Sequence, residues 1–318
     1  MSRAAVQGGA APGAPGPDGP LVPEPQTFAG AGRLARWASF VKLPHTVFAL
    51  PFALVGVVLA SFRHAVDARI VGWVVVAFTA ARFAAMAFNR IVDRDVDAAN
   101  PRTRMRELPS GMLGVAEAKF SVLVASALFV LAAAMLNPLC FLLSPVALAW
   151  VFGYSYTKRF TRWSHLVLGL GLGIAPVGGY LAVTGAWSEP WWLVCALSLA
   201  VTTWVGGFDI LYALQDEQFD RLTGLHSIPV AMGEVGAIRI ARALHVGTVA
   251  MLALVAAGAT GARAWVAVGV ALVAALLLWE HRLVKPGDLS KLDAAFFTMN
   301  GVISLVFFAC VLAGRVFG

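Results

Sequence analysis

The stretch Asn89-Arg-Ile-Val-Asp93-Arg-Asp-Val-Asp97 follows a long apolar segment and is abruptly rich in charge. Asn89, Asp93 and Asp97 recur every four residues, so on a helix they point the same way, with a drift of about 40° per step. The two carboxylates repel each other unless a cation lies between them. A hard cation that prefers oxygen ligands, such as Mg²⁺, would relieve this repulsion. We therefore predict a magnesium site at the end of a helix.

Three arginines, Arg102, Arg104 and Arg106, follow this acidic face within a few residues. Their guanidinium groups present forked N–H donors that match the oxygens of a phosphate. Together, the acidic face and the arginines predict a site for a magnesium-bound phosphorylated ligand at a membrane surface. The plainer alternative is a solvated cytoplasmic loop whose charges only determine the membrane topology.

The composition excludes a soluble domain. The 318 residues are 59% hydrophobic and 13% charged, with a mean hydropathy of +0.79. A soluble protein of this size cannot hide so much apolar surface. The net charge is +7, but no basic cluster is interleaved with aromatic residues. We therefore expect membrane lipid, and no nucleic acid, as the partner of the basic residues.

The repeated apolar segments predict an all-α polytopic membrane protein with nine transmembrane helices. Residues 1–32 are rich in Ala, Gly and Pro and lack the apolar core of a signal peptide, so we expect a disordered tail. Residues 33–318 then form one transmembrane domain. The predicted spans are 44–62, 70–90, 118–136, 138–156, 165–186, 191–210, 238–258, 263–281 and 295–314.

Lys and Arg residues segregate between the two sides of this nine-span scheme. One side holds only Arg63, Arg69, Arg263 and Arg315, whereas Arg82 lies inside a span and all the others fall on the opposite side. The positive-inside rule then puts the N-terminus in the cytoplasm and the C-terminus outside. We therefore expect a multi-pass protein of the inner (cytoplasmic) membrane, with its active site at the cytoplasmic side.

A second acidic stretch lies at the end of the sixth predicted span. Asp216 and Asp220 repeat the four-residue spacing, and they follow Asp93 and Asp97 by the same interval, which suggests a distant internal duplication. Both acidic faces fall on the same predicted side of the membrane. Two such faces could bind one Mg²⁺ each and grip a diphosphate between them.

On these residues the chain resembles the UbiA superfamily of intramembrane aromatic prenyltransferases. The resemblance covers nearly the whole chain after residue 35 and includes the count of nine helices. It implies a UbiA-type helical bundle, a polyprenyl diphosphate donor and Mg²⁺ bound by the two acidic motifs. The positions that match the motifs are Asn89, Asp93 and Asp97, followed by Asp209, Tyr212, Asp216 and Asp220.

The implied reaction is loss of diphosphate from an allylic chain, followed by attack of an electron-rich ring. Metal ions and cationic side chains would neutralise the charge of the leaving group. For Lys158 and Arg159, a charge that only sets topology is the plainer alternative. We assign to the metal Asn89, Asp93, Asp97, Asp216 and Asp220. We assign to the diphosphate Arg102, Arg106, Tyr154, Lys158 and Arg159.

Two charged residues fall inside predicted spans. A carboxylate as deep as Asp209 is costly there, so we expect it to be functional. We assign it, with Tyr212 one turn further on, to catalysis, where it would stabilise positive charge on the prenyl cation or the ring. For Arg82, two roles stay open: contact with a ligand, or pairing with an aspartate to hold two helices together.

The acceptor implied by the resemblance is an aromatic carboxylate. The second motif resembles the 4-hydroxybenzoate polyprenyltransferases, whereas Lys42-Leu-Pro-His45 resembles a subgroup in which some members prenylate a naphthoate for menaquinone. Ubiquinone-type members carry an arginine where this chain has Phe40. We predict that Lys42, helped by His45, binds the acceptor carboxylate instead.

Two alternatives are left open. The glycines of the fifth predicted span, including Gly169 and Gly178, permit either close helix packing or a tunnel wall. The alternative function is a transporter of a phosphorylated or cationic solute that uses the acidic motifs for ion coupling. Transporter sites of this kind lie near the membrane midplane, whereas the charges here gather at one membrane face.

Overall fold

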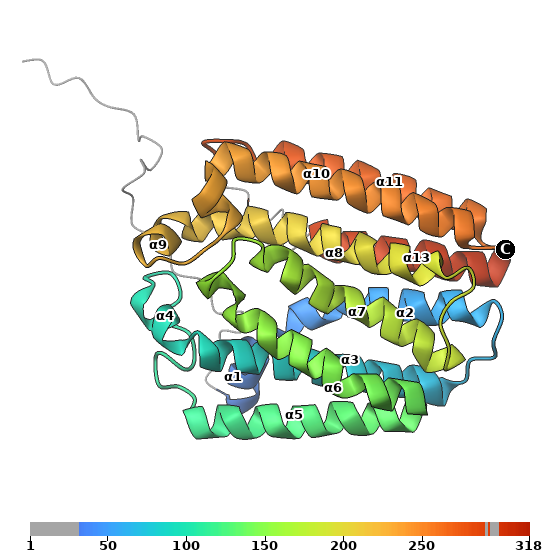
Figure 1. The fold of residues 1–318 in the computed structure, drawn as a ribbon, viewed down its shortest axis with the longest axis horizontal. Coiled ribbons are helices and arrows are strands. Elements are labelled where there is room, and N and C mark those ends of the chain that lie inside the picture. The colour runs from blue at the N-terminus through green and yellow to red at the C-terminus, as the bar shows by residue number, and fades with distance from the viewer. Residues whose placement is uncertain (1–31, 290–291, 293–298) are drawn as a thin grey trace, which may run out of the picture.

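The computed structural model describes residues 32–289, 292 and 299–318, and these form a bundle of helices (Figure 1). The predicted disordered tail, residues 1–32, lies outside the described residues except for Gly32. The elements in chain order are α1 (Arg33–Phe40), α2 (Leu43–Ser61), α3 (Ala68–Val92), α4 (Arg94–Ala99), α5 (Val115–Leu136), α6 (Pro138–Gly153), η1 (Tyr154–Arg159), α7 (Ser164–Thr184), α8 (Trp192–Ala213), η2 (Leu214–Asp216), α9 (Glu217–Leu222), α10 (Ile228–Gly258), α11 (Arg263–Leu283) and α13 (Asn300–Phe317).

The prediction of an all-helical membrane bundle is confirmed. Eight of the described helices are long and apolar enough to cross a membrane. The first predicted span, 44–62, corresponds to α2, whose apolar part, Ala49–Ser61, is shorter than the others. The count of nine therefore stays a prediction. One predicted boundary was wrong, because α10 begins at Ile228 rather than at 238. Within this helix Gly233 alone has a non-helical conformation, which marks a kink.

Helix α8 lies at the centre of the bundle and packs against α7 and α10, while α2 packs against α7 and α13. An aromatic cluster joins three of these helices. The ring of Phe52 on α2 lies 4.9 Å from that of Trp204 on α8 and 5.8 Å from that of Phe307 on α13. Large apolar side chains such as Leu142 and Val246 are exposed on the outside of the bundle. Helices that are apolar on all sides are typical of a protein surrounded by lipid.

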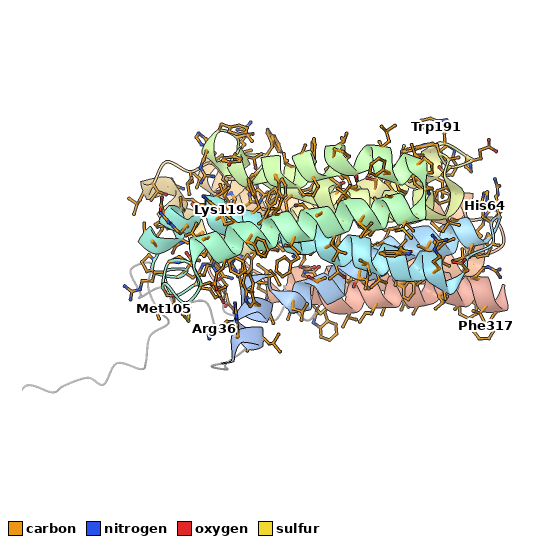
Figure 2. The ribbon with its side chains drawn as sticks, turned by 90° about the horizontal axis from the view of Figure 1, so that it is seen from below. Arg36, His64, Met105, Lys119, Trp191 and Phe317 are labelled. Atoms are coloured by element: carbon orange, nitrogen blue, oxygen red, sulfur yellow. The ribbon has the colours of Figure 1, made fainter. Side chains whose placement is uncertain are left out.

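The two ends of the bundle differ in character. Helices α4 and α9 lie at one end, and the C-terminus lies at the other (Figure 1). Figure 2 shows Arg36, Met105 and Lys119 at the first end, and His64, Trp191 and Phe317 at the opposite end. Both acidic motifs therefore lie at the same end of the bundle as these basic residues.

The glycines of α7 serve both of the roles that the sequence left open. A Cβ at Gly169 would collide with the backbone carbonyl of Thr202 on α8, so this glycine lets two helix backbones approach closely. A Cβ at Gly178 would meet no atom within 4 Å, and Gly178 lines an apolar cavity instead. One helix thus packs tightly on one face and leaves space on another.

We predict that Gly169→Ala lowers the free energy of unfolding by about 1–3 kcal/mol, because the added methyl forces apart two packed backbones. Gly178→Ala is the matched control, and we expect a change within about 0.5 kcal/mol, because its methyl enters open space. Thermal unfolding of the purified variants in detergent measures both. Equal melting temperatures for the two variants would contradict this account of the packing between α7 and α8.

Candidate active site

Both acidic motifs lie at breaks between helices, so the single helix face expected for Asn89, Asp93 and Asp97 is interrupted at Asp93. Asp93 separates α3 from α4 with φ −93° and ψ 6°. Asp216 precedes α9 with nearly the same conformation, φ −103° and ψ 1°. Each break leaves the second aspartate of its motif, Asp97 or Asp220, buried on a short separate helix. The matching geometry of the two breaks agrees with the equal sequence interval between the motifs.

Four aspartates of the two motifs each form an ion pair with one of the four predicted diphosphate-binding cations. The contacts cross the bundle, because most of the partners are far apart in the sequence. Predicted metal ligands and predicted anion-binding groups thus meet at one place. The pairs are Asp93 with Arg159 at 3.1 Å, Asp97 with Arg106 at 2.6 Å, Asp216 with Arg102 at 2.6 Å, and Asp220 with Lys158 at 3.2 Å.

The pair between Arg102 and Asp216 has the most extensive contacts. Arg102 donates from Nε and from Nη2 to the two carboxylate oxygens, at 2.8 and 2.6 Å, and both side chains are buried. Asn100 donates a further hydrogen bond to Oδ1 of Asp216 at 3.0 Å. The guanidinium also donates to the Tyr212 hydroxyl at 3.2 Å. This network ties the segment after α4 to the end of α8.

The first motif contains a buried oxygen to which none of the described residues donates a hydrogen bond. Asn89 donates its amide N–H to Asp93 at 2.9 Å. Oδ2 of Asp97 is buried and has no hydrogen-bond partner among the described residues, and Nη1 of Arg90 lies 4.0 Å away. Burial raises the pKa of the Asp93 carboxyl, the neighbouring Asp97 raises it further, and the Arg159 guanidinium opposes the rise. Both effects raise the pKa because they destabilise the negative charge of the Asp93 carboxylate, and a bound cation would stabilise that charge.

The residues fit Mg²⁺ held jointly with a phosphate. Within the described part of the chain, no group of three or more His, Cys, Asp or Glu side chains is arranged to hold a metal by itself. Mg²⁺ usually takes one or two carboxylates and completes its shell with substrate phosphates and water. The carboxylate pair of each motif supplies this donor set, and the orphaned oxygen of Asp97 is one suitable ligand atom.

Three adjoining cavities converge on this site, and Tyr154 and Leu168 line all of them. The polar cavity, of about 210 Å³, is lined by every residue assigned above to metal, diphosphate or catalysis. The middle cavity, of about 180 Å³, is lined by Lys42, Arg82, Asp209 and other residues. The apolar groove, of about 190 Å³, lies among side chains of α3, α5, α6 and α7.

Four cationic side chains line the middle cavity, namely Lys42, Arg82, Arg90 and Arg106, and two of them bear on the acceptor. Lys42 is buried, and its Nζ lies 5.7 Å from the centre of the Tyr212 ring. Arg82 lines both the middle cavity and the apolar groove, and in the described part of the chain its buried Nε has no hydrogen-bond partner. No aspartate of the described residues forms an ion pair with Arg82, so the pairing considered for it stays a prediction. His45 belongs to α2, but its side chain lies outside what the structure describes.

Asp209 is not the isolated carboxylate that the sequence suggests. Its Oδ2 lies 2.7 Å from Nδ1 of His165, a fully buried residue of α7. His165 is not part of either acidic motif, and the sequence did not predict its role. Its position beside Ser164, at the start of an otherwise apolar span, was the signal that could have identified it.

Comparison with known proteins gives a consistent result. The sequence pattern of the UbiA prenyltransferase family matches residues 49–302. A 4-hydroxybenzoate octaprenyltransferase of Aromatoleum aromaticum is 31% identical over 236 residues, which cover 73% of this chain and 77% of the relative. The protein of the same name from Sodalis glossinidius is 31% identical over 246 residues, covering 73% of this chain and 78% of the relative.

Solved structures share the fold. The apo structure of a UbiA homolog from Aeropyrum pernix K1 matches with a TM-score of 0.75 and 32% identity, over 85% of this chain and 97% of the other. A UbiA homolog from Archaeoglobus fulgidus bound to DMAPP and Mg²⁺ matches with a TM-score of 0.69 and 22% identity. The match covers 89% of this chain and 100% of the other. At that identity the second match supports the fold alone.

We predict that Arg102→Gln lowers the free energy of unfolding by about 3–5 kcal/mol, because it leaves the buried Asp216 carboxylate without its bidentate partner. Arg94→Gln is the control, since its pair with Asp95 has side chains 45% and 86% exposed. An exposed pair contributes at most about 1 kcal/mol. Thermal unfolding in detergent compares the two variants. A smaller loss of stability for Arg102→Gln than for Arg94→Gln would refute the structural role of the buried pair.

Proposed function

This chain belongs to the UbiA prenyltransferase family, and we propose that it moves a polyprenyl group from a polyprenyl diphosphate to 4-hydroxybenzoate or a hydroxynaphthoate in quinone biosynthesis. The polar cavity carries this proposal, because there four aspartates meet four cations beside an apolar groove. The names of the relatives, 4-hydroxybenzoate octaprenyltransferase, support an aromatic carboxylate as the acceptor.

At the donor end, the two carboxylate pairs would hold Mg²⁺, which when bound supplies positive charge to the departing diphosphate. The homolog of the same fold from Archaeoglobus fulgidus is itself bound to DMAPP and Mg²⁺. The cations now paired with the aspartates would turn to the diphosphate oxygens, since guanidinium and ammonium groups bind phosphate well. The side chains that make this exchange are Arg102, Arg106, Lys158 and Arg159.

The apolar groove would hold the prenyl tail. It extends from Tyr154 and Leu168, which it shares with the polar cavity, along α7 to Leu181. Its apolar walls would keep water away from the allylic cation until the ring attacks. Gly178 leaves the space that the tail requires.

At the acceptor end, the middle cavity offers Lys42 and Arg82. Moving a carboxylate out of water without a partner costs several kcal/mol of free energy, so the acceptor needs a cationic group in the site. Lys42, which directly precedes α2, would bind the acceptor carboxylate with help from His45 in the first turn of that helix, and Arg82 of α3 can share this role. Asp209 and Tyr212 line both the middle and the polar cavities, where the ring and the prenyl carbon would meet.

The proposed orientation follows from charge. The end of the bundle that carries the polar cavity also carries Arg36 and Lys119 (Figure 2). By the positive-inside rule this end would face the cytoplasm of the inner membrane. A water-soluble acceptor would then reach the site from the cytoplasm. The transporter alternative is disfavoured, since the acidic motifs lie at one end of the bundle (Figure 1).

We predict that Asp93→Ala and Asp216→Ala each lower prenyl transfer by about 100-fold or more, because each removes one carboxylate from the proposed metal sets. The assay uses protein purified in detergent, polyprenyl diphosphate, 4-hydroxybenzoate and Mg²⁺, without any gradient. EDTA should stop the reaction and Mg²⁺ should restore it. Asp95→Ala is the matched control in the first motif, because its side chain is 86% exposed. Full activity of either Asp93→Ala or Asp216→Ala would refute the two-metal proposal.

We predict that Lys42→Ala raises the acceptor KM about tenfold or more, because a hydrogen bond to a charged group contributes about 1.5–3 kcal/mol. The donor KM should change little. Arg82→Ala is tested in parallel against 4-hydroxybenzoate and a hydroxynaphthoate. Its acceptor KM shows how much Arg82 contributes to binding the acceptor carboxylate. An unchanged acceptor KM for Lys42→Ala, together with a raised acceptor KM for Arg82→Ala, would refute Lys42 and identify Arg82 as the partner of the acceptor carboxylate.

A further inference from the structure

The proposed reaction replaces a ring hydrogen by carbon, so every turnover must remove one proton from the ring. The C–O bond of the prenyl diphosphate breaks, and its electron pair leaves with the diphosphate. A C–C bond then forms between the prenyl carbon and the ring. Finally the ring C–H bond breaks, its electron pair restores the aromatic system, and the proton passes to a base. That base must lie where donor and acceptor meet.

Few side chains lie at that place. In the described part of the chain, six residues line both the polar and the middle cavities, and Asp209 is the single carboxylate among them. A guanidinium has no site that accepts a proton, and an amide, a leucine and the two phenols are poor bases at neutral pH. The six residues are Asn89, Arg106, Tyr154, Leu168, Asp209 and Tyr212.

The two oxygens of Asp209 have different surroundings. Oδ2 lies 2.7 Å from Nδ1 of His165. Oδ1 has no hydrogen-bond partner among the described residues, and the side chain is 25% exposed. One oxygen is therefore held by the protein, and the other is available to the cavities.

A backbone group determines which nitrogen of His165 carries the proton. The backbone N–H of Ile228 donates to Nε2 of His165, at 3.4 Å. A neutral imidazole that accepts at Nε2 must carry its proton on Nδ1, so Nδ1–H donates to Asp209. The contact joins the starts of α7 and α10 to the end of α8. A fully buried ring held from both sides fixes the rotamer of the carboxylate.

From this geometry we infer that Asp209 accepts the ring proton at Oδ1, and that His165 is a positioning residue that holds Asp209 for this step. His165 lines none of the three cavities, so it acts through Asp209 and not by touching substrate. The inference rests on the proposed function, since only a reaction at an aromatic ring requires this proton transfer. It adds to that function the base and the residue that orients it.

The test compares two amide replacements of His165. The side-chain nitrogen of His165→Asn can occupy the position of Nδ1, whereas that of His165→Gln falls at the position of Nε2. We expect His165→Asn to keep most of the wild-type kcat. We expect His165→Gln to lose about 10–100-fold in kcat, the usual effect of removing an orienting hydrogen bond, with both KM values within about twofold.

A kinetic isotope effect distinguishes positioning from general destabilisation. The acceptor is 4-hydroxybenzoate with deuterium at the ring carbons beside the hydroxyl. In the wild type we expect ring attack to limit the rate, and therefore no primary isotope effect. In His165→Gln and in Asp209→Asn, removal of the proton becomes slow, so a primary isotope effect should appear.

The outcomes are distinct. Equal kcat values for the Asn and Gln variants, or a slow Gln variant without an isotope effect, would overturn the inference while the proposed function stands. A wild-type protein that prenylates neither 4-hydroxybenzoate nor a hydroxynaphthoate would overturn both. Thermal unfolding of each variant in detergent accompanies the kinetics. If His165→Gln does not fold, the isotope effect in Asp209→Asn decides, and its absence would refute Asp209 as the base.

Discussion

The buried pairing of acidic and basic side chains at one end of the bundle is the interaction on which the rest of the structure depends. Charges at the edge of a membrane bundle are costly unless each has a partner. Arg102 and Asp216 meet this requirement across a large sequence distance, so the segment after α4 is tied to the end of α8. The same pairing holds the aspartates proposed to bind Mg²⁺ and the cations proposed to bind diphosphate in one cavity. Mg²⁺ and diphosphate would then replace these partners when they bind.

The arrangement separates three environments that one reaction requires. Charge is confined to the polar cavity, the apolar groove runs between helices, and the middle cavity carries cations for a carboxylate. Tyr154 and Leu168 border all three, so they mark the point where the reacting atoms would meet. The groove exists because α7 packs closely through glycines such as Gly169 and leaves space beside Gly178. Tight packing and an open cavity are thus properties of the same helix.

The two charged residues within the spans are stabilised in different ways. Asp209 is held by a neutral histidine, which satisfies one oxygen and leaves the other accessible. Arg82 lies between two cavities without an aspartate partner among the described residues. A buried group that lacks a protein partner costs free energy in the absence of ligand, and that cost is recovered when a complementary ligand binds. Both residues therefore fit a site that is completed by its substrates.

The sequence by itself determined the membrane class, the helical bundle and the identity of both acidic motifs, because composition and four-residue spacing are local properties. It also identified the cations that line the polar cavity. Only the tertiary structure decided that the helices break at Asp93 and Asp216, that Arg102 pairs with Asp216, and that His165 holds Asp209. These features join residues far apart in the chain. Their geometry depends on how whole helices pack, and no local pattern of side chains encodes that packing.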